Sequence, residues 1–478
     1  MFLQQLLNGL NYEIKGETFI DVDSLACDTR QVKKGCMFFC IKGGQVDGHS
    51  FYRKAVGDGA VAIVCEKPLD TEVTQIIVKD SREFMARVAK NFYHNAIDKM
   101  KLIAVVGTNG KTSTTYLIDS VLNVAGYNTA VVGSNGIFIN GQHYDSTLTT
   151  PDPIQLHSWF YQMYLNKVHF VIMEVSAHAI ALKKMSGIKA DLTVFTNFSQ
   201  DHLDFFKDMQ TYAKVKKSFF DRKYTATAVV NADDELGKEI IRDCKLPIVT
   251  YGIKNADVWA SDIQCDDKIS YTLNMCGEQA RAVYPLRAMF NVYNTLAASC
   301  AVRMFGIKVD KIIEGISSVN CIDGRNETFV RSDNVKIVVD FAHTPDGVNN
   351  ILSYLKSQCE GRLIVVFGCG GNRDKFKRPL MGSTVSRYAD FAVITNDNPR
   401  FESPTAIVAD IEGGMTCEYK VVLNRSQATE FALSVAKCGD TVAILGKGSE
   451  KYQDIRGKKY PYSDVDVVHN LIKNDGEK

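Results

Sequence analysis

Short apolar runs alternate with longer amphipathic stretches along most of the chain. The runs that read as strands lie at 37–43, 61–66, 102–106, 129–133, 169–176, 191–198, 226–234, 335–344, 362–371, 390–400 and 440–448. Runs that are apolar on both faces and separated by helical stretches are typical of parallel strands joined by crossovers. The pattern therefore predicts an α/β protein with mostly parallel sheets. Residues 1–17 predict a short surface helix.

The runs fall into three groups, and a chain of 478 residues is long enough for about three domains of ~150 residues each. We place the domains at 1–98, 99–326 and 327–478. No linker rich in Pro, Gly or Ser marks either boundary, so each boundary follows from the grouping of the runs.

Composition narrows the class of partner. The net charge is +1, with 45% hydrophobic and 23% charged residues, so no overall field attracts nucleic acid or a membrane surface. No run reaches the ~18 apolar residues of a membrane helix, and the start of the chain does not resemble a signal peptide. The 13 cysteines form no CxxC pair, which is typical of reduced thiols in a cytoplasmic protein.

The stretch "VVGTNGKTSTT" (105–115) joins a predicted strand to a predicted helix at 115–126. Glycines between a strand and a helix start expose backbone N–H groups to an anion, and the helix dipole adds to their attraction. Lys111 is placed to reach the outer phosphates of a nucleotide, and the Thr112 hydroxyl to hold Mg²⁺. The usual glycine five residues before the final glycine is missing, because Val105 stands there. The alternative is a glycine turn with a surface lysine.

Further motifs follow in a fixed order. They are "CDTRQVKKGCMFFCIKGGQVDGHSF" (27–51), "TTPD" (149–152), "MEVSAHAI" (173–180), "FTNFSQDHLDFF" (195–206), "YAKVKKSFF" (212–220), "NVYNTLAA" (291–298), "GRNE" (324–327), "DFAHTPD" (340–346), "FGCGGNRDKFKRPLMG" (367–382), "DNPR" (397–400) and "GKGSEKYQ" (446–453). With "GTNGKTST", this order resembles the Mur ligases, the ATP-dependent amide-forming enzymes of peptidoglycan precursor synthesis. The resemblance covers nearly the whole chain.

The resemblance implies a uridine-nucleotide domain, a central P-loop-type ATPase domain with a mostly parallel sheet, and a Rossmann-like C-terminal domain. It also implies a chemistry in which ATP phosphorylates a carboxylate and an amine displaces phosphate from the acyl phosphate. Such catalysis needs positioning and charge neutralisation and no side-chain nucleophile. We find no GxSxG or Cys/His arrangement in the sequence.

The nucleotide and Mg²⁺ contacts implied by the resemblance are Gly107, Thr108, Asn109, Gly110, Lys111, Thr112, Ser113, Asn294, Arg325 and Asp340 for ATP, and Thr112, Glu174, His202 and Lys216 for the metal. Glu174 ends a buried run, where a carboxylate is placed to bind Mg²⁺. Lys216 lies four residues after Tyr212, the spacing at which the family has a lysine carbamylated by CO₂. We expect Lys214 and Lys217 to help lower its pKa. The alternatives are a capping role for Glu174, a structural His202, a surface amide at Asn294 and an exposed lysine at 216.

For the donor, a uridine-linked muramoyl dipeptide, the resemblance points to Thr29, Arg30, Gly44, Gln45, Val46, Thr149, Thr150, Ser176 and Lys184. The family often has histidine at the positions of Gly44 and Ser449, and arginine at the position of Lys184. Lysine keeps the charge there but loses the two-pronged guanidinium. These departures leave the form of the donor open.

The acceptor amino acid is expected to bind at Arg373, Asp397, Asn398, Pro399, Arg400, Gly446 and Glu450. "DNPR" ends a predicted strand, where open α/β sheets place their ligands. Arg400 offers two parallel hydrogen bonds to a carboxylate, and meso-diaminopimelate differs from lysine by one carboxylate. The resemblance therefore implies a ligase that adds meso-diaminopimelate to UDP-N-acetylmuramoyl-L-alanyl-D-glutamate, acting as a cytoplasmic monomer. The alternatives are an L-lysine acceptor, another amide-forming pathway, and a nucleotide-binding regulator without catalysis.

Overall fold

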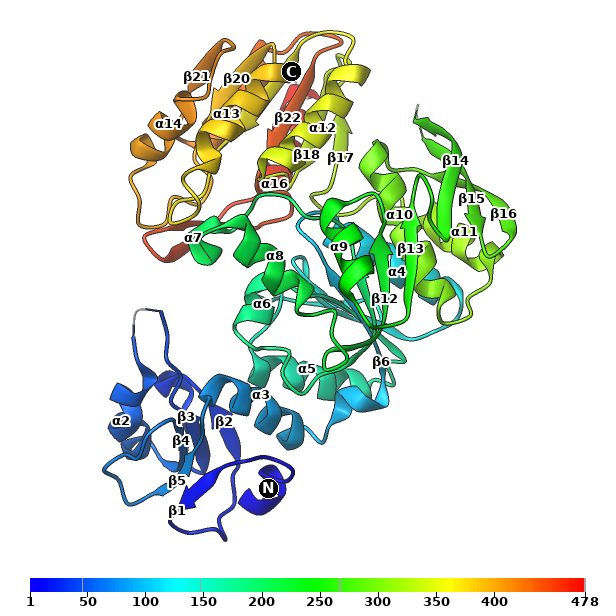
Figure 1. The fold of residues 1–478 in the computed structure, drawn as a ribbon. Helices are drawn as coiled ribbons and strands as arrows, with labels where there is room; N and C mark the ends of the chain where they lie inside the picture. Colours follow the sequence, from blue (N-terminus) through cyan, green and yellow to red (C-terminus); the bar gives the residue numbers. More distant parts are fainter. Residues whose placement is uncertain (45, 147, 266–267, 477–478) are drawn as a thin grey trace.

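The strands form four sheets in the computed structural model, which describes residues 1–44, 46–146, 148–265 and 268–476 (Figure 1). The first sheet is parallel except for β1 at one edge. Its order is β1 (Glu13–Lys15), β5 (Thr74–Ile77), β4 (Ala60–Cys65), β3 (Cys36–Phe39) and β2 (Ser24–Ala26). Helices α1 (Leu3–Leu6), α2 (Tyr52–Gly57) and α3 (Ser81–Phe92) accompany it.

The surface helix predicted for residues 1–17 is wrong in extent and environment. Only α1 is helical there, and Leu3 and Leu6 are buried in the core of this first sheet. The two leucines are three residues apart, so they project from one side of the helix, and burying that side outweighs the polar residues between them.

The second sheet has a parallel centre and antiparallel margins. Its order is β16 (Glu278–Tyr284), β15 (Ile269–Met275), β14 (Val258–Cys265), β13 (Ile248–Gly252), β12 (Thr225–Asn231), β11 (Ala190–Phe195), β6 (Lys101–Val106), β10 (Phe170–Glu174), β7 (Thr129–Gly133), β8 (Gly136–Ile139) and β9 (Gln142–Tyr144). Strands β7 to β9 and β14 to β16 are antiparallel meanders, and neither was predicted as a meander. Buried and exposed residues alternate in β14 and β16, so these strands lack the continuous apolar run that marks a central strand, whereas β7 is buried throughout and was predicted at 129–133.

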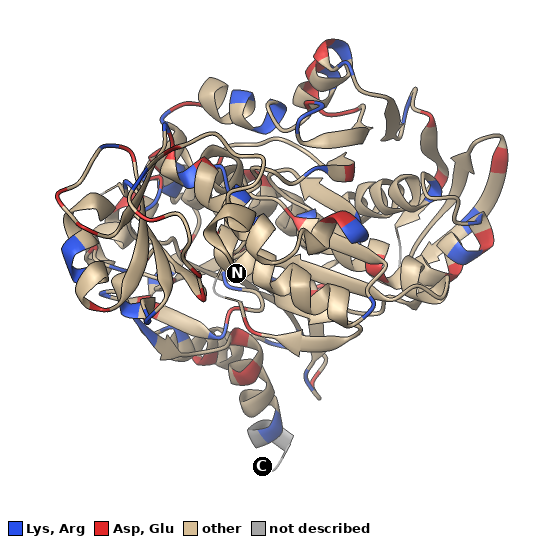
Figure 2. Cartoon of the chain, turned by 90° about the horizontal axis from the view of Figure 1, so that it is seen from below, with Lys and Arg blue, Asp and Glu red and all other residues tan. Residues whose placement is uncertain are grey.

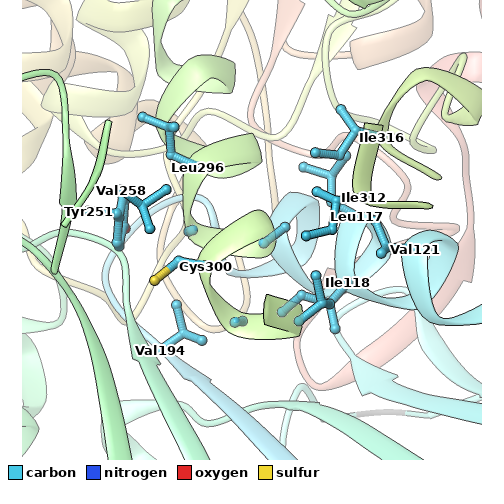
Figure 3. Close-up of a cluster of buried hydrophobic side chains, with 14 of the residues drawn as sticks. Leu117, Ile118, Val121, Val194, Tyr251, Val258, Leu296, Cys300, Ile312 and Ile316 are labelled. Carbon is cyan, nitrogen blue, oxygen red and sulfur yellow. The ribbon is translucent and has the colours of Figure 1, made fainter. Parts of the chain in front are cut away.

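Helices α4 (Lys111–Val124), α10 (Met289–Arg303) and α11 (Val309–Ser318) pack together beside this sheet. Leu117, Val121, Leu296, Cys300 and Ile316 meet there in one apolar cluster (Figure 3). Helix α4 follows the phosphate loop directly, so this cluster fixes the direction from which the helix N-terminus faces its ligand. The remaining helices of this part are α5 (Pro153–Leu165), α6 (Ala177–Ala181), α7 (Leu203–Phe206), α8 (Met209–Lys217) and α9 (Glu235–Asp243).

The third sheet is parallel except for β17. Its order is β17 (Glu327–Val330), β18 (Lys336–Asp340), β22 (Thr441–Leu445), β19 (Leu363–Phe367), β20 (Phe391–Ile394) and β21 (Tyr419–Val421). Around it lie α12 (Pro345–Gln358), α13 (Lys377–Tyr388), α14 (Pro404–Glu412), α15 (Arg425–Val435) and α16 (Asp464–Gly476), and β23 (Tyr452–Ile455) pairs with β24 (Lys458–Pro461). We keep the domain division at 98 and 326 as a proposal, because both positions lie between sheets.

The central strands were predicted in place, but several end earlier than the predicted runs. The run at 390–400 contains β20, which ends at Ile394, and the run at 191–198 contains β11, which ends at Phe195. The leftover residues are the loops at the carboxyl ends of the strands. None of the helices in the described ranges combines the length and the apolar character that crossing a bilayer requires.

Lysine, arginine, aspartate and glutamate positions are interspersed over the ribbon (Figure 2). This distribution agrees with the near-zero net charge of the chain.

Gly315 gives a test of the helix packing behind the phosphate loop. A Cβ at Gly315 would lie 2.4 Å from the Cα of Val121 on α4, a backbone contact that side-chain rotation cannot relieve. We expect Gly315→Ala to destabilise the protein by about 1–3 kcal/mol through overpacking, despite the better helix propensity of alanine. Gly57→Ala is the matched control, because a Cβ at Gly57 meets nothing within 4 Å. Thermal unfolding midpoints measure both, and an unchanged midpoint for Gly315→Ala would contradict the packing described.

Candidate active site

A cavity of about 650 Å³ lies where the carboxyl ends of two parallel sheets face each other. The second sheet contributes the phosphate loop after β6, Glu174 at the end of β10 and Asn231 at the end of β12. The third sheet contributes Asp340 at the end of β18 and the loops after β19, β20 and β22. The site is therefore shared between the second and third predicted domains, and neither sheet encloses it alone.

The phosphate loop is shaped by its two glycines. A Cβ at Gly107 would lie 1.8 Å from the Thr196 hydroxyl, and one at Gly110 would lie 2.5 Å from the Asn294 side-chain oxygen. Gly110 also has φ +81°, which a side chain disfavours. The backbone N–H of Asn109 donates to the Asn197 side chain at 2.9 Å, which holds the loop against the next strand end.

Lys111 begins α4 and folds back over the loop. Its Nζ donates to the carbonyls of Gly107 at 3.1 Å and Thr108 at 2.8 Å. Burial lowers the pKa of Lys111, with Glu174 opposing that effect. Lys111 is thus part of the cavity wall and not a solvated surface lysine, so its ammonium group is available to a phosphate that enters the loop.

Thr112, Glu174 and Arg325 form a buried chain of hydrogen bonds. The Thr112 hydroxyl donates to Glu174 Oε1 at 2.9 Å, and Arg325 Nη2 donates to the same hydroxyl at 2.9 Å. In the described part of the chain, Arg325 Nε is buried without a hydrogen-bond partner. An unpaired buried guanidinium donor at a cavity wall fits an anionic ligand, because leaving it unpaired costs about 1–3 kcal/mol.

Glu174 fits the predicted magnesium contact. Its carboxylate is 1% exposed, lines the cavity and accepts only from neutral donors, Thr112 and Ser134, among the hydrogen bonds that the structure describes. A buried carboxylate that lines a cavity and receives no hydrogen bond from a cation favours a hard cation. Within the described ranges, no three His, Cys, Asp or Glu side chains gather closely enough to hold a metal. Mg²⁺ bound here would therefore draw further oxygen ligands from phosphate or from a modified Lys216.

Lys216 is fully buried on α8, and Lys214 on the same helix is exposed. Burial and the charge of Lys111 hold the pKa of Lys216 well below its usual range. The expectation that Lys214 and Lys217 supply this effect is wrong, because Lys217 pairs with Glu239 and Asp243 at the surface and Lys214 points to solvent. A neutral amine is the form that reacts with CO₂, so the environment suits carbamylation, which stays a prediction.

His202 lies beside a buried ionic network that crosses between the two sheets. Asp201 Oδ2 lies 3.3 Å from His202 Nε2 and 3.6 Å from His343 Nε2, and Asp201 Oδ1 accepts from Lys377 Nζ at 3.2 Å. Burial alone would raise the pKa of Asp201, but Lys377 and the histidines lower it well below its usual range. Burial lowers the pKa of His202 to about 3, so its imidazole is neutral and suited to a metal.

Two further predicted nucleotide contacts line the cavity. Asn294 is buried on α10, its amide donating to Asn291 at 3.0 Å, so the alternative of a surface amide is excluded. Asp340 accepts from the backbone N–H groups of Asn326 and Ala342, both at 2.7 Å. The structure brings both residues beside the phosphate loop, and their roles toward adenine and ribose stay predictions.

The donor residues are not all brought together. Thr149 and Ser176 line the cavity, whereas Thr150 and Lys184 lie behind the wall, joined by a bond from Lys184 Nζ to the Thr150 carbonyl at 3.1 Å. Thr29, Arg30, Gly44 and Val46 belong to the first sheet region and do not line the cavity, and Gln45 lies outside the described residues. Arg30 is 86% exposed on its side chain and pairs with Asp28.

The acceptor end of the cavity is positively charged on one side. Arg373, Asp397, Asn398, Arg400, Gly446 and Glu450 line it, whereas Pro399 does not. Arg400 has φ +50°, and its Nη1 donates to the Gly371 carbonyl at 2.7 Å. Burial and the neighbouring Arg373 lower the pKa of Arg400, and Asp454 approaches Arg400 Nε only to 3.9 Å. Arg373 lies 3.8 Å from Asp204, so both arginines have only long ion pairs, and two adjacent cations held in this way favour an anionic group on the ligand.

The sequence reasoning missed three residues that build the site. Lys377 carries the ion pair to Asp201, His343 faces the same carboxylate, and fully buried Lys447 bonds to Asn398 and Glu450. Lys377 and Lys447 lie inside the motifs "FGCGGNRDKFKRPLMG" and "GKGSEKYQ", so the sequence already marked both segments as functional, although it did not single out these two lysines. Nothing in a sequence distinguishes a buried lysine from its exposed neighbours without knowledge of the face on which it lies.

Fold and site together define a class: a multidomain α/β protein in which a nucleotide-type phosphate loop and an anion-binding strand end share one cavity. Family models for the Mur ligase family, catalytic domain (residues 21–93), the Mur ligase middle domain (105–302) and the Mur ligase, glutamate ligase domain (324–448) match the chain. The chain belongs to the Mur ligase family.

Individual relatives agree with this assignment. The chain is 40% identical over 482 residues to the UDP-N-acetylmuramoyl-L-alanyl-D-glutamate--2,6-diaminopimelate ligase of Clostridioides difficile (strain 630), with 99% of each chain covered. It is also 40% identical over 484 residues to the protein of that name from Bacillus velezensis (strain DSM 23117 / BGSC 10A6 / LMG 26770 / FZB42), again with 99% of each covered. A solved structure of a ligase with that name superimposes with a TM-score of 0.70 at 28% identity, covering all of both chains.

Lys216 gives the test of the predicted carbamate. We expect Lys216→Ala to lose nearly all ATP turnover, because the predicted carbamate, a second anionic ligand for the metal, is then missing. Short-chain carboxylic acids should restore part of that turnover by occupying the vacated space as an anion. The matched control is Lys214→Ala, which removes an exposed lysine from the same helix and should leave turnover near the wild-type rate. A reversal of the two results would mean that the register is wrong.

Proposed function

We propose that this protein is an ATP-dependent ligase that joins meso-diaminopimelate to UDP-N-acetylmuramoyl-L-alanyl-D-glutamate in peptidoglycan precursor synthesis. The bond formed is an amide between the D-glutamate carboxylate and an amino group of the acceptor. ATP and Mg²⁺ are the cofactors, and the substrates are small molecules. Family membership and relatives of this name over the full length support the proposal.

One observation carries the proposal: the phosphate loop and the Arg400 loop open into the same cavity. One end of the cavity is electropositive, because Lys111, Arg325 and the N-terminus of α4 lie there, and phosphates would bind at this end. Arg373 and Arg400 make the other end electropositive as well, and an acceptor carboxylate would bind there. Thr149 and Ser176 lie on the cavity wall, on the face where the donor would present its carboxylate.

The reaction follows from what the residues hold in place. Lys111 and Arg325 would neutralise charge on the transferred phosphoryl group, and Mg²⁺ held through Glu174 and Thr112 would supply further neutralisation when bound. The donor carboxylate becomes an acyl phosphate, the acceptor amine attacks the acyl carbon, and phosphate leaves.

The main alternative to this function is a ligase with the same chemistry that uses a different acceptor amino acid. An L-lysine-adding ligase would leave Arg400 and Arg373 beside each other without the second carboxylate that meso-diaminopimelate brings. The arginine pair therefore favours meso-diaminopimelate. A nucleotide-binding regulator is less favoured, because it has no need for an acceptor cavity with a buried metal-type carboxylate. We also propose a monomer acting in the cytoplasm, where ATP and the nucleotide-linked donor are available.

The activity test measures phosphate release from ATP with the donor present and one amino acid added at a time. We expect release to depend on meso-diaminopimelate, with L-lysine far less effective. If phosphate release requires L-lysine instead, the proposed acceptor is wrong, but the proposed ATP-dependent amide formation still holds. Release without any amino acid, or none with either one, would contradict the proposed ligase.

Arg400 is the residue we expect to select the acceptor. Arg400→Ala removes about two charge-assisted hydrogen bonds worth ~1.5–3 kcal/mol each, so kcat/KM for meso-diaminopimelate should fall by about two to four decades. Activity with lysine should fall far less, because lysine lacks the carboxylate that Arg400 binds. An equal fall for both amino acids would make Arg400 a structural support of its loop. Arg456→Ala is a control on a neighbouring exposed arginine outside the cavity.

A further inference from the structure

Lys447 is a buried cation directly behind the acceptor end of the cavity. Its side chain is fully buried, and it follows Gly446 in the loop after β22. Lys447 does not line the cavity, whereas Asn398 and Glu450, the two residues that it bonds, both do. A buried ammonium group is costly unless it is paired, so this lysine is held by specific partners.

Those partners leave Asn398 a single orientation. Lys447 Nζ donates to Asn398 Oδ1 at 3.1 Å, and the backbone N–H of Asp454 donates to the same oxygen at 2.9 Å. With its oxygen facing two donors, the Asn398 amide group must present Nδ2 on the other side, where it donates to Glu450 Oε2 at 3.0 Å. Lys447 thus sets which face of Asn398 meets Glu450.

Glu450 is held in the same way. Its Oε2 accepts from Lys447 Nζ at 2.8 Å as well as from Asn398. Among the hydrogen bonds of the described residues, none reaches Oε1, and the side chain is 27% exposed toward the cavity. Glu450 therefore keeps one free carboxylate oxygen for a ligand ammonium group, while Lys447 neutralises part of its charge.

The charge of Lys447 also reaches Asp397. Burial alone would raise the pKa of Asp397, but Lys447 and then Arg425 lower it below its usual value. The acceptor end thus holds two carboxylates, Asp397 and Glu450, and a lysine that offsets one of them. Arg400 and Arg373 line the same end of the cavity, and their nearest carboxylates in the described structure, Asp454 for Arg400 and Asp204 for Arg373, approach only to 3.9 and 3.8 Å.

We infer that Lys447 is a positioning residue that sets the acceptor preference of the ligase. With Lys447 in place, the site matches a distal group that carries one ammonium and one carboxylate, as meso-diaminopimelate does. Without the charge of Lys447, Glu450 loses its cationic hydrogen-bond partner, so it attracts an ammonium group more strongly and repels a carboxylate. The site then favours a distal end that carries only an ammonium group, as in lysine, over a distal end that also carries a carboxylate, as in meso-diaminopimelate. This inference rests on the proposed function.

The test measures kcat/KM for meso-diaminopimelate and for L-lysine in Lys447→Met, which keeps the length of the side chain and removes its charge. We expect the ratio of the two constants to shift toward lysine by about tenfold to a hundredfold, the range of one hydrogen bond to a charged group. The KM of the acceptor should carry the change, and the KM of ATP should stay within about twofold, because the nucleotide binds at the other end.

Three variants separate positioning from a structural effect. Lys451→Met makes the same charge change on an exposed lysine nearby and should leave the ratio unchanged. Lys447→Arg keeps the charge and should keep the preference for meso-diaminopimelate even where kcat falls. If Lys447→Met fails to fold, Lys447→Met with Glu450→Gln removes both charges of the pair, and its ratio should match that of Glu450→Gln alone.

The outcomes for the two proposals differ. A wild-type enzyme that uses lysine in preference to meso-diaminopimelate overturns both the proposed acceptor and the role of Lys447. A wild-type enzyme that prefers meso-diaminopimelate, with the same ratio in Lys447→Met, overturns only the role of Lys447. If Lys447→Met shifts the ratio of the two constants as much in the Glu450→Gln background as in the wild-type background, Lys447 does not act through Glu450, and the inference is overturned.

Discussion

The site depends on one constraint: parallel strands place all their carboxyl ends at one edge of a sheet, and here two such edges face each other. The Asp201–Lys377 ion pair is buried between them, so each sheet leaves an uncompensated charge when the other moves away. Breaking a buried pair by removing one partner typically costs about 3–5 kcal/mol. The cavity, the phosphate loop and the Arg400 loop are thus held in a common frame by a contact that neither sheet satisfies alone.

Within that frame, the site keeps several charges incompletely paired. Arg325 Nε has no acceptor in the described part of the chain, Glu174 has neutral donors only, and Lys216 has a strongly lowered pKa. The unpaired Arg325 donor and the buried Glu174 carboxylate each cost stability that a ligand of opposite charge would recover. Preorganised groups of this kind do not have to reorient when charge develops, which is how electrostatic catalysis differs from solvation by water.

The sequence predicted the parallel strands, the phosphate loop and most of the cavity lining, because these features are local. An apolar run of five or six residues, or glycines before a lysine, is visible in a short window. The pairing of Lys377 with Asp201 and of Lys447 with Glu450 is set by sheet contacts and by which helix face turns inward, so it was not predictable. The same reason explains why Lys214 and Lys217 were wrongly given the role of Lys111 beside Lys216. Strands β14 and β16 escaped prediction because their exposed residues interrupt the apolar pattern, and the short β9 is largely exposed.

The contact between Ser449 and Asn135 joins positions that are 314 residues apart, with the Ser449 hydroxyl donating at 2.7 Å. The phosphate loop precedes that interval, and the loops that meet the acceptor lie in its later part. A ribosome adds about 5–20 residues per second, so the phosphate loop is synthesised roughly 15–65 s before the acceptor loop after β22 exists. During translation, the carboxylate of Asp201 and the apolar surfaces beside it are exposed to water unless a chaperone binds them. Efficient synthesis of this protein therefore depends on how long the second-sheet side of the cavity is protected before the third sheet folds. An enzyme of the same size whose site is formed by one sheet does not need this protection.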